Sequence, residues 1–266
     1  MTEELEDKSK SQIEQDLFVL HELNNKRNGY FVEFGATNGV DLSNTHLLEK
    51  EFGWTGILAE PAVSWHTALP KNRNCHIDFG CVWSKSGETL EFNNALAAEL
   101  STIDTFSDCD GHANARKSGL RYTVPTISLV DLLKKYNAPK DIDYLSIDTE
   151  GSEYEILNAF DFDAYSIKII TCEHNYTPMQ EKIYKLLTSK GYTRKFTECS
   201  YFDDWYVLNE RNDMELRDEF AKSIMAGIIA ADWKFDLTNK TWDEIAVRRA
   251  YEIADAMIKE RKVSNV

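Results

Sequence analysis

The carboxylates best suited to chemistry in this 266-residue chain follow a short apolar run. Residues Ile142–Ile147 have the pattern of a buried strand, and Asp148, Glu150 and Glu153 come directly after it. Carboxylates are costly to keep at the end of a buried strand, and open α/β sheets bind ligands at the carboxyl ends of their strands. The segment therefore predicts a site with Asp148 and Glu150 as catalytic residues. Glu153 equally suits the first turn of a helix, where acids complement the dipole.

The loop after the first predicted strand could hold a nucleoside cofactor. Tyr30–Phe34 runs into Gly35, and a glycine just past a strand lets the backbone turn and a ligand approach closely. A dinucleotide fingerprint G-x-G-x-x-G would need glycine at positions 37 and 40, which hold threonine and valine. The missing glycines argue against a nicotinamide or flavin cofactor and leave an E-x-G-x-x-x-G loop from Glu33 to Gly39.

Two carboxylates at strand ends complete this predicted cofactor site. Glu33 lies near the end of the first strand, where its carboxylate could receive a cationic amine. Glu60 follows the second predicted strand, Ile57–Ala59, at a position that suits the two hydroxyls of a ribose. S-adenosylmethionine (SAM) is a ribose-bearing cofactor with an amino group and no diphosphate. The predicted cofactor-binding residues are Glu33, Gly35, Thr37, Gly39, Glu60 and Asp148.

A further polar group follows the predicted strand Ile167–Cys172. Glu173, His174 and Asn175 end that strand, so adjacent strand tips should bring them near Asp148. Methyl transfer to an alcohol requires that something take the hydroxyl proton, and His174 is a candidate because its pKa is naturally near neutrality. Alternatively, Asp148, Glu173 and Asn175 could hold Mg²⁺ or Mn²⁺, which would lower the pKa of the acceptor oxygen. The sequence leaves both alternatives open.

The elements that must position these residues alternate along the chain. Short apolar strands are predicted at 30–34, 57–59, 76–82, 142–147 and 167–172, with closing strands at 192–196 and 206–208. Helical periodicity separates them at 11–28, 44–52, 128–136, 153–160 and 179–189. This alternation predicts an α/β fold with a doubly wound, mostly parallel sheet. Residues 93–122 show no clear period and are predicted to be a long loop that decides acceptor specificity, with His112 as a possible contact.

The chain changes character after about residue 210. Leu216, Phe220, Ile224 and Ile228 form a stripe at helical spacing, and a capping-box pattern at 241–244 opens a second helix. We therefore predict an N-terminal helical segment over 1–29, a catalytic domain over 30–210 and a C-terminal helical appendage over 211–266. The simplest interpretation of the appendage is a docked helical hairpin. A more specific hypothesis is that it forms a surface for a homo-oligomer or another partner.

The composition of the chain limits the classes of partner that it can bind. With 30 Lys and Arg against 45 Asp and Glu, the formal net charge is −15, which disfavours nucleic acid because its binding relies on cations that neutralise phosphates. No apolar run approaches the ~20 residues that a membrane helix needs, and the polar N-terminus is unlike a signal peptide. Five scattered cysteines without a CxxC pair indicate reduced thiols. We expect no membrane partner and a cytoplasmic location.

Several stretches resemble the FkbM-type SAM-dependent methyltransferases. These are SQIEQDLFVL at 11–20, FVEFGATNG at 31–39, SNTHLLEKEFGWTGILAEP at 43–61, ELSTID at 99–104, DYLSIDTEGSEYEIL at 143–157, CEHN at 172–175 and FDDWYV at 202–207. The resemblance covers roughly residues 11–208. It implies a class I methyltransferase fold, a Rossmann-like sheet with a final antiparallel strand. It also implies SAM as methyl donor and O-methylation of a sugar, glycan or polyketide-type metabolite.

The resemblance also implies residue roles. Glu33, Gly35 and Gly39 would line the methionine side of the cofactor, Glu60 the ribose, and Asp148 and Glu150 the reacting centre. The sequence thus favours a SAM-dependent O-methyltransferase acting on a saccharide, glycan or small metabolite. Two alternatives stay open: a non-catalytic binding or assembly protein with a degenerate methyltransferase domain, and a nicotinamide or flavin oxidoreductase on a similar fold.

Overall fold

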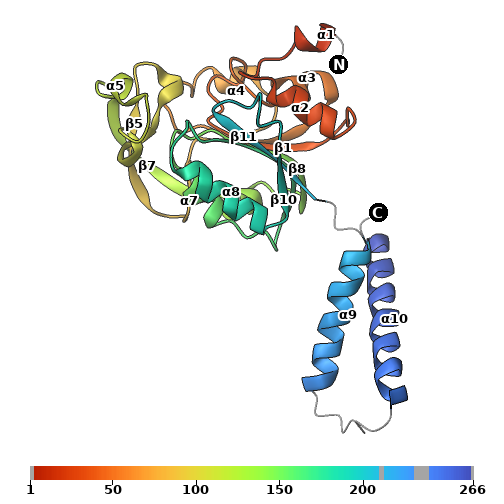
Figure 1. Ribbon diagram of the computed structural model, residues 1–266. Helices are drawn as coiled ribbons and strands as arrows, with labels where there is room; N and C mark the ends of the chain where they lie inside the picture. The colour runs from red at the N-terminus through yellow and green to blue at the C-terminus, as the bar shows by residue number, and fades with distance from the viewer. Residues whose placement is uncertain (1–2, 210–212, 231–239, 265–266) are drawn as a thin grey trace. The chain divides into compact units, whose positions relative to one another are not determined.

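The chain divides into two compact units, Met1–Leu208 and Asn209–Val266. The computed structural model describes residues 3–209, 213–230 and 240–264 (Figure 1). The helices of the first unit are α1 Glu3–Glu6, α2 Gln15–Glu22, α3 His46–Phe52, α4 Leu69–Asn72, α5 Ala113–Arg116, α6 Leu129–Lys135, α7 Glu153–Asn158 and α8 Met179–Ser189, with 3₁₀ turns η1 Ala98–Leu100 and η2 Asp104–Phe106.

A seven-stranded sheet with the order β10-β11-β9-β8-β1-β2-β3 forms the centre of the first unit. Its strands are β1 Tyr30–Phe34, β2 Thr55–Ala59, β3 His76–Asp78, β8 Asp141–Ile147, β9 Ser166–Glu173, β10 Tyr192–Lys195 and β11 Asp203–Leu208. Strands β3, β2, β1, β8 and β9 are parallel, and the last strand, β11, lies antiparallel between β9 and β10. The predicted doubly wound, mostly parallel sheet with a final antiparallel strand is confirmed.

Helices cover both faces of this sheet, which explains why its central strands are almost continuously apolar. One hydrophobic cluster joins α6, α7 and α8 to the sheet, and a second joins α2, α3 and α4 to the opposite face. Figure 1 shows α7 and α8 on one side of the sheet and α2 and α3 on the other. Leu17 and Leu20 of α2 are fully buried, so the N-terminal helix belongs to the core of the first unit.

A second sheet, of order β4-β7-β5-β6, flanks the region predicted to be a long loop. Its strands are β4 Cys81–Trp83, β5 Thr89–Asn94, β6 Thr102–Ile103 and β7 Leu120–Ser128. The strand predicted over 76–82 is split, because β3 pairs with β2 in the large sheet and β4 pairs with β7 in the second one. Within the predicted loop 93–122, the end of β5, the short strand β6 and the start of β7 belong to this sheet, and the remainder consists of turns with η1, η2 and α5. The prediction missed the pairing of β5 with β6 and β7, which joins residues far apart in the chain and buries few side chains.

The second unit consists of α9 Asp213–Ala230 and α10 Lys240–Ser264. Ala221, Ala250 and Ala254 are buried between the two helices, and Phe220 and Ile224 of the predicted stripe pack against them. The side chains of Leu216 and Ile228, and the capping-box residues 241–244, lie outside the residues whose side chains the structure describes. Over the described ranges, no helix combines the length and the apolar character needed to cross a membrane.

Candidate active site

The site lies where the strand order of the large sheet reverses, between the carboxyl ends of β1 and β8. Open α/β sheets bind ligands at such a switch point. Gly35 follows β1 with φ +73°, and a Cβ atom built on it would lie 2.0 Å from the backbone oxygen of Asp148, which follows β8. Only glycine allows the two strand ends to approach this closely. Two cavities open beside this contact and share the lining residues Gly35, Thr37, Glu99 and Asp148.

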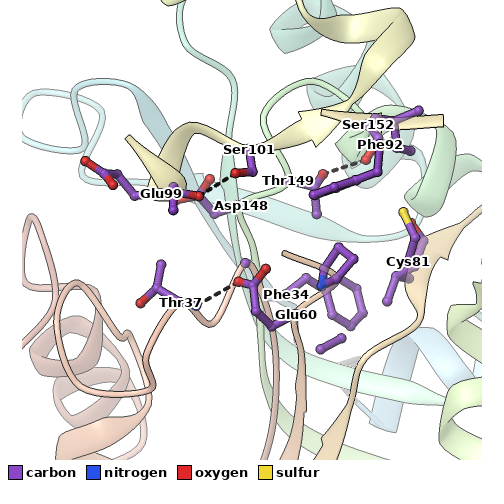
Figure 2. A pocket seen from close by; sticks show the side chains of 16 residues that line it. Phe34, Thr37, Glu60, Cys81, Phe92, Glu99, Ser101, Asp148, Thr149 and Ser152 are labelled. Atoms are coloured by element: carbon purple, nitrogen blue, oxygen red, sulfur yellow. Dashed lines mark hydrogen bonds between the residues drawn. The ribbon is translucent and has the colours of Figure 1, made fainter. Parts of the chain in front are cut away.

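The first cavity has Glu60 as its buried acid. Figure 2 shows Glu60 and Thr37 on one side of this cavity and Asp148 and Thr149 on the other. The Glu60 carboxylate accepts hydrogen bonds from the backbone N–H groups of Thr37 (2.9 Å) and Ala62 (2.8 Å), one on each oxygen. Burial raises the pKa of Glu60 to about 7, although both hydrogen bonds act in the opposite direction. Each carboxylate oxygen keeps lone-pair capacity for a ligand hydroxyl.

The second cavity, of about 210 Å³, lies beside the first and is strongly acidic. Asp148, Glu150 and Glu173 each present a carboxylate oxygen, and these atoms lie within 4.8 Å of one another. The other residues that line the cavity are Gln12, Gly35, Thr37, Leu42, Glu99, Leu100, His112, Asn175 and Phe202. The structure therefore brings together the predicted residues Asp148, Glu150, Glu173 and Asn175, and His112 reaches the same cavity.

Asp148 and Glu173 form a carboxyl pair at the adjacent ends of β8 and β9. Burial raises the pKa of Asp148 to about 7, although its hydrogen bond with Glu173 acts in the opposite direction. Burial and the neighbouring charge of Asp148 raise the pKa of Glu173 well above its usual range. Two carboxylates this close disfavour simultaneous ionisation, so the pair retains a proton near neutral pH.

Glu150 is held differently, by a buried arginine that sequence reasoning missed. The backbone of Glu150 is left-handed, with φ +58°. Its carboxylate accepts hydrogen bonds from Arg116 Nη2 (2.6 Å) and Asn175 Nδ2 (3.1 Å). Arg116 also binds Asp110 (2.8 Å) and the backbone oxygen of Leu100 (2.8 Å). No sequence pattern marked Arg116, because it lies in a stretch without periodicity.

His174 does not reach either cavity, contrary to the expectation that it could be the general base. Its Nδ1 atom accepts a hydrogen bond from the backbone N–H of Tyr176 (3.0 Å). Its Nε2 atom lies 3.1 Å from Gln180 Nε2 and 3.7 Å from Asp204 Oδ1. Burial lowers the pKa of His174. Both ring nitrogens face protein groups, so the structure assigns His174 to the packing of β9, α8 and β11.

Glu33 and Gly39 are also not among the residues that line the two cavities. The Glu33 carboxylate accepts hydrogen bonds from Ser43 Oγ (3.0 Å), the Asn44 N–H (2.6 Å) and Thr45 Oγ1 (2.5 Å). These donors hold the carboxylate away from both cavities, so Glu33 supports the 43–45 loop instead. Gly39 has φ +80°, and a Cβ there would meet side-chain atoms of Arg73 and Leu69 at 2.6 Å. It shapes the loop that carries Thr37 without lining a cavity.

Residues of the second sheet and its connections supply the remaining walls. Glu99 lines both cavities, and Ala98, Ser101 and Ile103 line the first. The sequence singled out none of these residues by itself, although they lie in the 93–122 segment predicted to decide acceptor specificity and Glu99 opens the ELSTID stretch. Glu153 also has a structural role, because its carboxylate accepts hydrogen bonds from the N–H groups of Thr149 (2.9 Å) and Gly151 (3.0 Å) and so closes the turn after β8.

Solved structures with a similar fold are methyltransferases of low sequence identity. A precorrin-6y C5,15-methyltransferase from Geobacter metallireducens is 10% identical, with a TM-score of 0.39, over 72% of this chain and 85% of that one. A putative sarcosine dimethylglycine methyltransferase from Galdieria sulphuraria is 10% identical, with a TM-score of 0.32, over 91% and 80%. The N-terminal domain of human METTL16, in complex with SAH, is 14% identical, with a TM-score of 0.32, over 73% and 65%. Because these TM-scores are low, the fold is assigned from the strand order of this chain and not from its similarity to these structures.

Comparison with protein families gives a more specific result. Residues 33–196 match the methyltransferase FkbM domain. No curated protein matches the chain significantly. The matched range includes both strand ends at the switch point and the carboxylates Glu60, Asp148, Glu150 and Glu173. Because this match spans more than half of the chain, the chain belongs to the FkbM family of methyltransferases.

Proposed function

We propose that this chain transfers a methyl group from SAM to a hydroxyl of a saccharide, glycan or small metabolite. The observation that carries the proposal is the pair of adjoining cavities at the β1/β8 switch point. A buried acid with free lone pairs, Glu60, lies in the first cavity, and the Asp148–Glu173 carboxyl pair lies at the second. Membership of the FkbM family supports the methyl transfer, and the chemistry of the two cavities supports the division of roles.

The first cavity suits the nucleoside part of SAM. The Glu60 carboxylate can accept hydrogen bonds from both ribose hydroxyls while it keeps those from Thr37 and Ala62. Asp148 borders both cavities and so lies beside the place where the cofactor and the acceptor would meet. The first cavity is narrow, about 40 Å³, against ~300 Å³ or more for typical ligand sites. This cavity must therefore widen when a nucleoside enters.

The carboxyl pair suits the removal of the acceptor proton. SAM, when bound, supplies the methyl group as an electrophile on a sulfonium sulfur. A carboxylate whose pKa lies near 7, as that of Asp148 does, matches the general base that neutral pH requires. Asp148 can take the hydroxyl proton as the new C–O bond forms, and Glu173 can share that proton. This assignment replaces His174, whose ring nitrogens are both within hydrogen-bond distance of protein groups.

A divalent cation is the alternative way to activate the hydroxyl. The three carboxylate oxygens of Asp148, Glu150 and Glu173 lie within 4.8 Å of one another, which fits the oxygen ligands of Mg²⁺ or Mn²⁺. Asn175 would contribute its carbonyl oxygen, since its amide nitrogen binds Glu150. However, the Arg116 guanidinium already places a permanent positive charge 2.6 Å from Glu150, which disfavours a second strong cation there. We therefore expect activity that EDTA leaves unchanged; activity lost in EDTA and restored by Mg²⁺ would establish the metal.

Titration with SAH tests the proposal. Wild-type protein should bind SAH in a calorimeter, and Glu60→Ala should raise the dissociation constant by roughly 10- to 100-fold, as expected for lost hydrogen bonds to a charged group. Glu91→Ala, at an exposed carboxylate on β5, is the control and should bind as the wild type does. Absence of SAH binding by the wild type would reject the proposal. Transfer of labelled methyl onto a panel of saccharides then separates an enzyme from a non-catalytic binding protein.

The proposed setting is the cytoplasm, where SAM and small acceptors are available and the five cysteines, all free thiols here, would stay reduced. We propose no nucleic-acid acceptor, because the net charge of −15 repels a polyanion. A measurable affinity for RNA or DNA at physiological salt would contradict this part of the proposal.

A further inference from the structure

Glu173 differs from the other buried acids of this protein. Among the residues that the structure describes, ten carboxylates are buried. Nine of them accept hydrogen bonds from N–H or O–H groups of the chain: Asp16, Glu33, Glu60, Asp78, Asp143, Glu150, Glu153, Asp203 and Asp204. Glu173, 7% exposed, is the exception, because its hydrogen-bond partner in the described chain is the Asp148 carboxyl.

The surroundings of Glu173 do not compensate for its charge. It lines the second cavity together with Glu99, Asp148 and Glu150, and neither Lys nor Arg is present among the described lining residues. The nearby cation, Arg116, is fully buried and already binds Asp110, Glu150 and the Leu100 carbonyl. Even with one shared proton, the Asp148–Glu173 pair keeps a negative charge in a buried setting, which is costly, so a ligand of this cavity must bring a compensating charge and hydrogen-bond donors.

The charge of the lining decides which ligand chemistry fits. A phosphate or carboxylate group would be repelled by the acids around it. A hydroxyl can donate one hydrogen bond but leaves the negative charge uncompensated. A protonated amine supplies up to three donors and a compensating charge, and charge-assisted hydrogen bonds are the strongest of these options.

We propose that the second cavity binds the acceptor through a protonated amine held by Glu173, so that the acceptor is an amino sugar or another amino alcohol. This inference rests on the proposed function and narrows its acceptor class. The bound ammonium has no lone pair to attack with, so the methyl group goes to a neighbouring hydroxyl. The cofactor also carries an ammonium group, but Glu173 lines only the second cavity whereas Asp148 lines both, which favours the acceptor as its source.

Three sugars of matched ring size test the inference on the full chain saturated with SAH. Glucosamine, glucose and glucuronate differ in charge but share most of their hydroxyls. Calorimetry should show glucosamine binding at least about tenfold more tightly than glucose, which is about 1.4 kcal/mol, and no detectable binding of glucuronate. In Glu173→Gln the advantage of glucosamine should fall below about twofold. Glu91→Gln, at an exposed acid, should keep it.

A second comparison identifies the source of the amine. 5′-Methylthioadenosine lacks the amino-acid part of SAH, so the ratio of the two affinities reports on the cofactor ammonium. Glu173→Gln should leave this ratio unchanged. A ratio that collapses in Glu173→Gln would assign Glu173 to the cofactor and overturn the acceptor assignment.

Other results would also overturn the inference. The inference fails if the wild type binds glucosamine no more tightly than it binds glucose. This result does not depend on whether the variant folds. An unchanged preference in Glu173→Gln, binding of none of the three sugars, or binding of Mg²⁺ in place of glucosamine would do the same. SAH binding by the wild type, measured first, shows whether the proposed function itself has failed.

Discussion

At the scale of single residues, hydrogen-bond donors distinguish the structural acids from those of the site. Glu33 and Glu153 were also candidates from the sequence, yet their carboxylates accept hydrogen bonds from nearby N–H and O–H groups. The carboxyl groups of Asp148 and Glu173 instead contact each other and line the second cavity. A carboxyl group in that position keeps a raised pKa and is available to a substrate.

Replacement of Asp148 should therefore affect turnover more than cofactor affinity. We expect Asp148→Asn to lower kcat by about 10²- to 10⁴-fold, the usual contribution of a general base, with only a small change in SAH affinity. Wild-type kcat should rise with pH through about 7, because the base is active once Asp148 has lost its proton. The variant should lack this rise. Initial rates from about pH 5.5 to 8.5, with SAH calorimetry alongside, measure both.

The matched comparison is His174→Gln. His174 lines no described cavity, so kcat should stay within about threefold, while the loss of buried hydrogen bonds should lower the free energy of unfolding by about 1–3 kcal/mol. A large loss of turnover in His174→Gln, or wild-type turnover in Asp148→Asn, would show that the proton acceptor has been assigned to the wrong residue.

At the scale of elements, the site is formed by the ends of parallel strands and by one wall from the second sheet. Strands β1, β8 and β9 carry Gly35, Asp148 and Glu173 to one edge of the large sheet. The connections of the second sheet add Glu99, Leu100 and His112. Arg116 connects the two parts by hydrogen bonds to Leu100 and Glu150, so the shape of the second cavity depends on both sheets.

The contact between the ends of β1 and β8 makes Gly35 sensitive to substitution. Gly35→Ala must accept a left-handed backbone and a clash with the Asp148 carbonyl, whereas Gly87→Ala, at φ +79°, meets no atom within 4 Å. We expect Gly87→Ala to cost about 1–2 kcal/mol of unfolding free energy and Gly35→Ala about 1–3 kcal/mol more. Gly35→Ala should also lose SAH binding. Urea denaturation and calorimetry measure the difference; equal costs at the two glycines would contradict the close approach.

At the scale of the whole molecule, the residues that we propose as catalytic all belong to the first unit. The second unit has a small core of its own, formed by Ala221, Ala250 and Ala254, and leaves Val247 and Met257 of α10 exposed. We propose that the second unit serves association of copies of this chain through the exposed apolar side chains of α10.

Removal of residues 209–266 should therefore change assembly and leave the site intact. We expect light scattering after size exclusion to show a dimer for the full chain and a monomer for the chain that ends at Leu208. SAH affinity should agree within about twofold, because the first unit has its own core. A monomeric full chain would remove the proposed role of the helices, and a loss of SAH binding on truncation would indicate that they support the site.

The sequence by itself determined the doubly wound sheet and the strand ends that carry Gly35, Glu60, Asp148 and Glu173. These features follow from local periodicity and from the rule that parallel strands meet at one edge. Only the tertiary structure decided which acids are free to meet a ligand. Arg73 and the 43–45 loop surround Glu33, Gln180 and Asp204 face His174, and Arg116 binds Glu150. Arg73, Asp204 and Arg116 each lie 30 or more residues from the group they contact. The pairing that formed the second sheet likewise joins segments that are distant in the chain. Hydrogen bonding and burial therefore depend on contacts that local patterns do not encode.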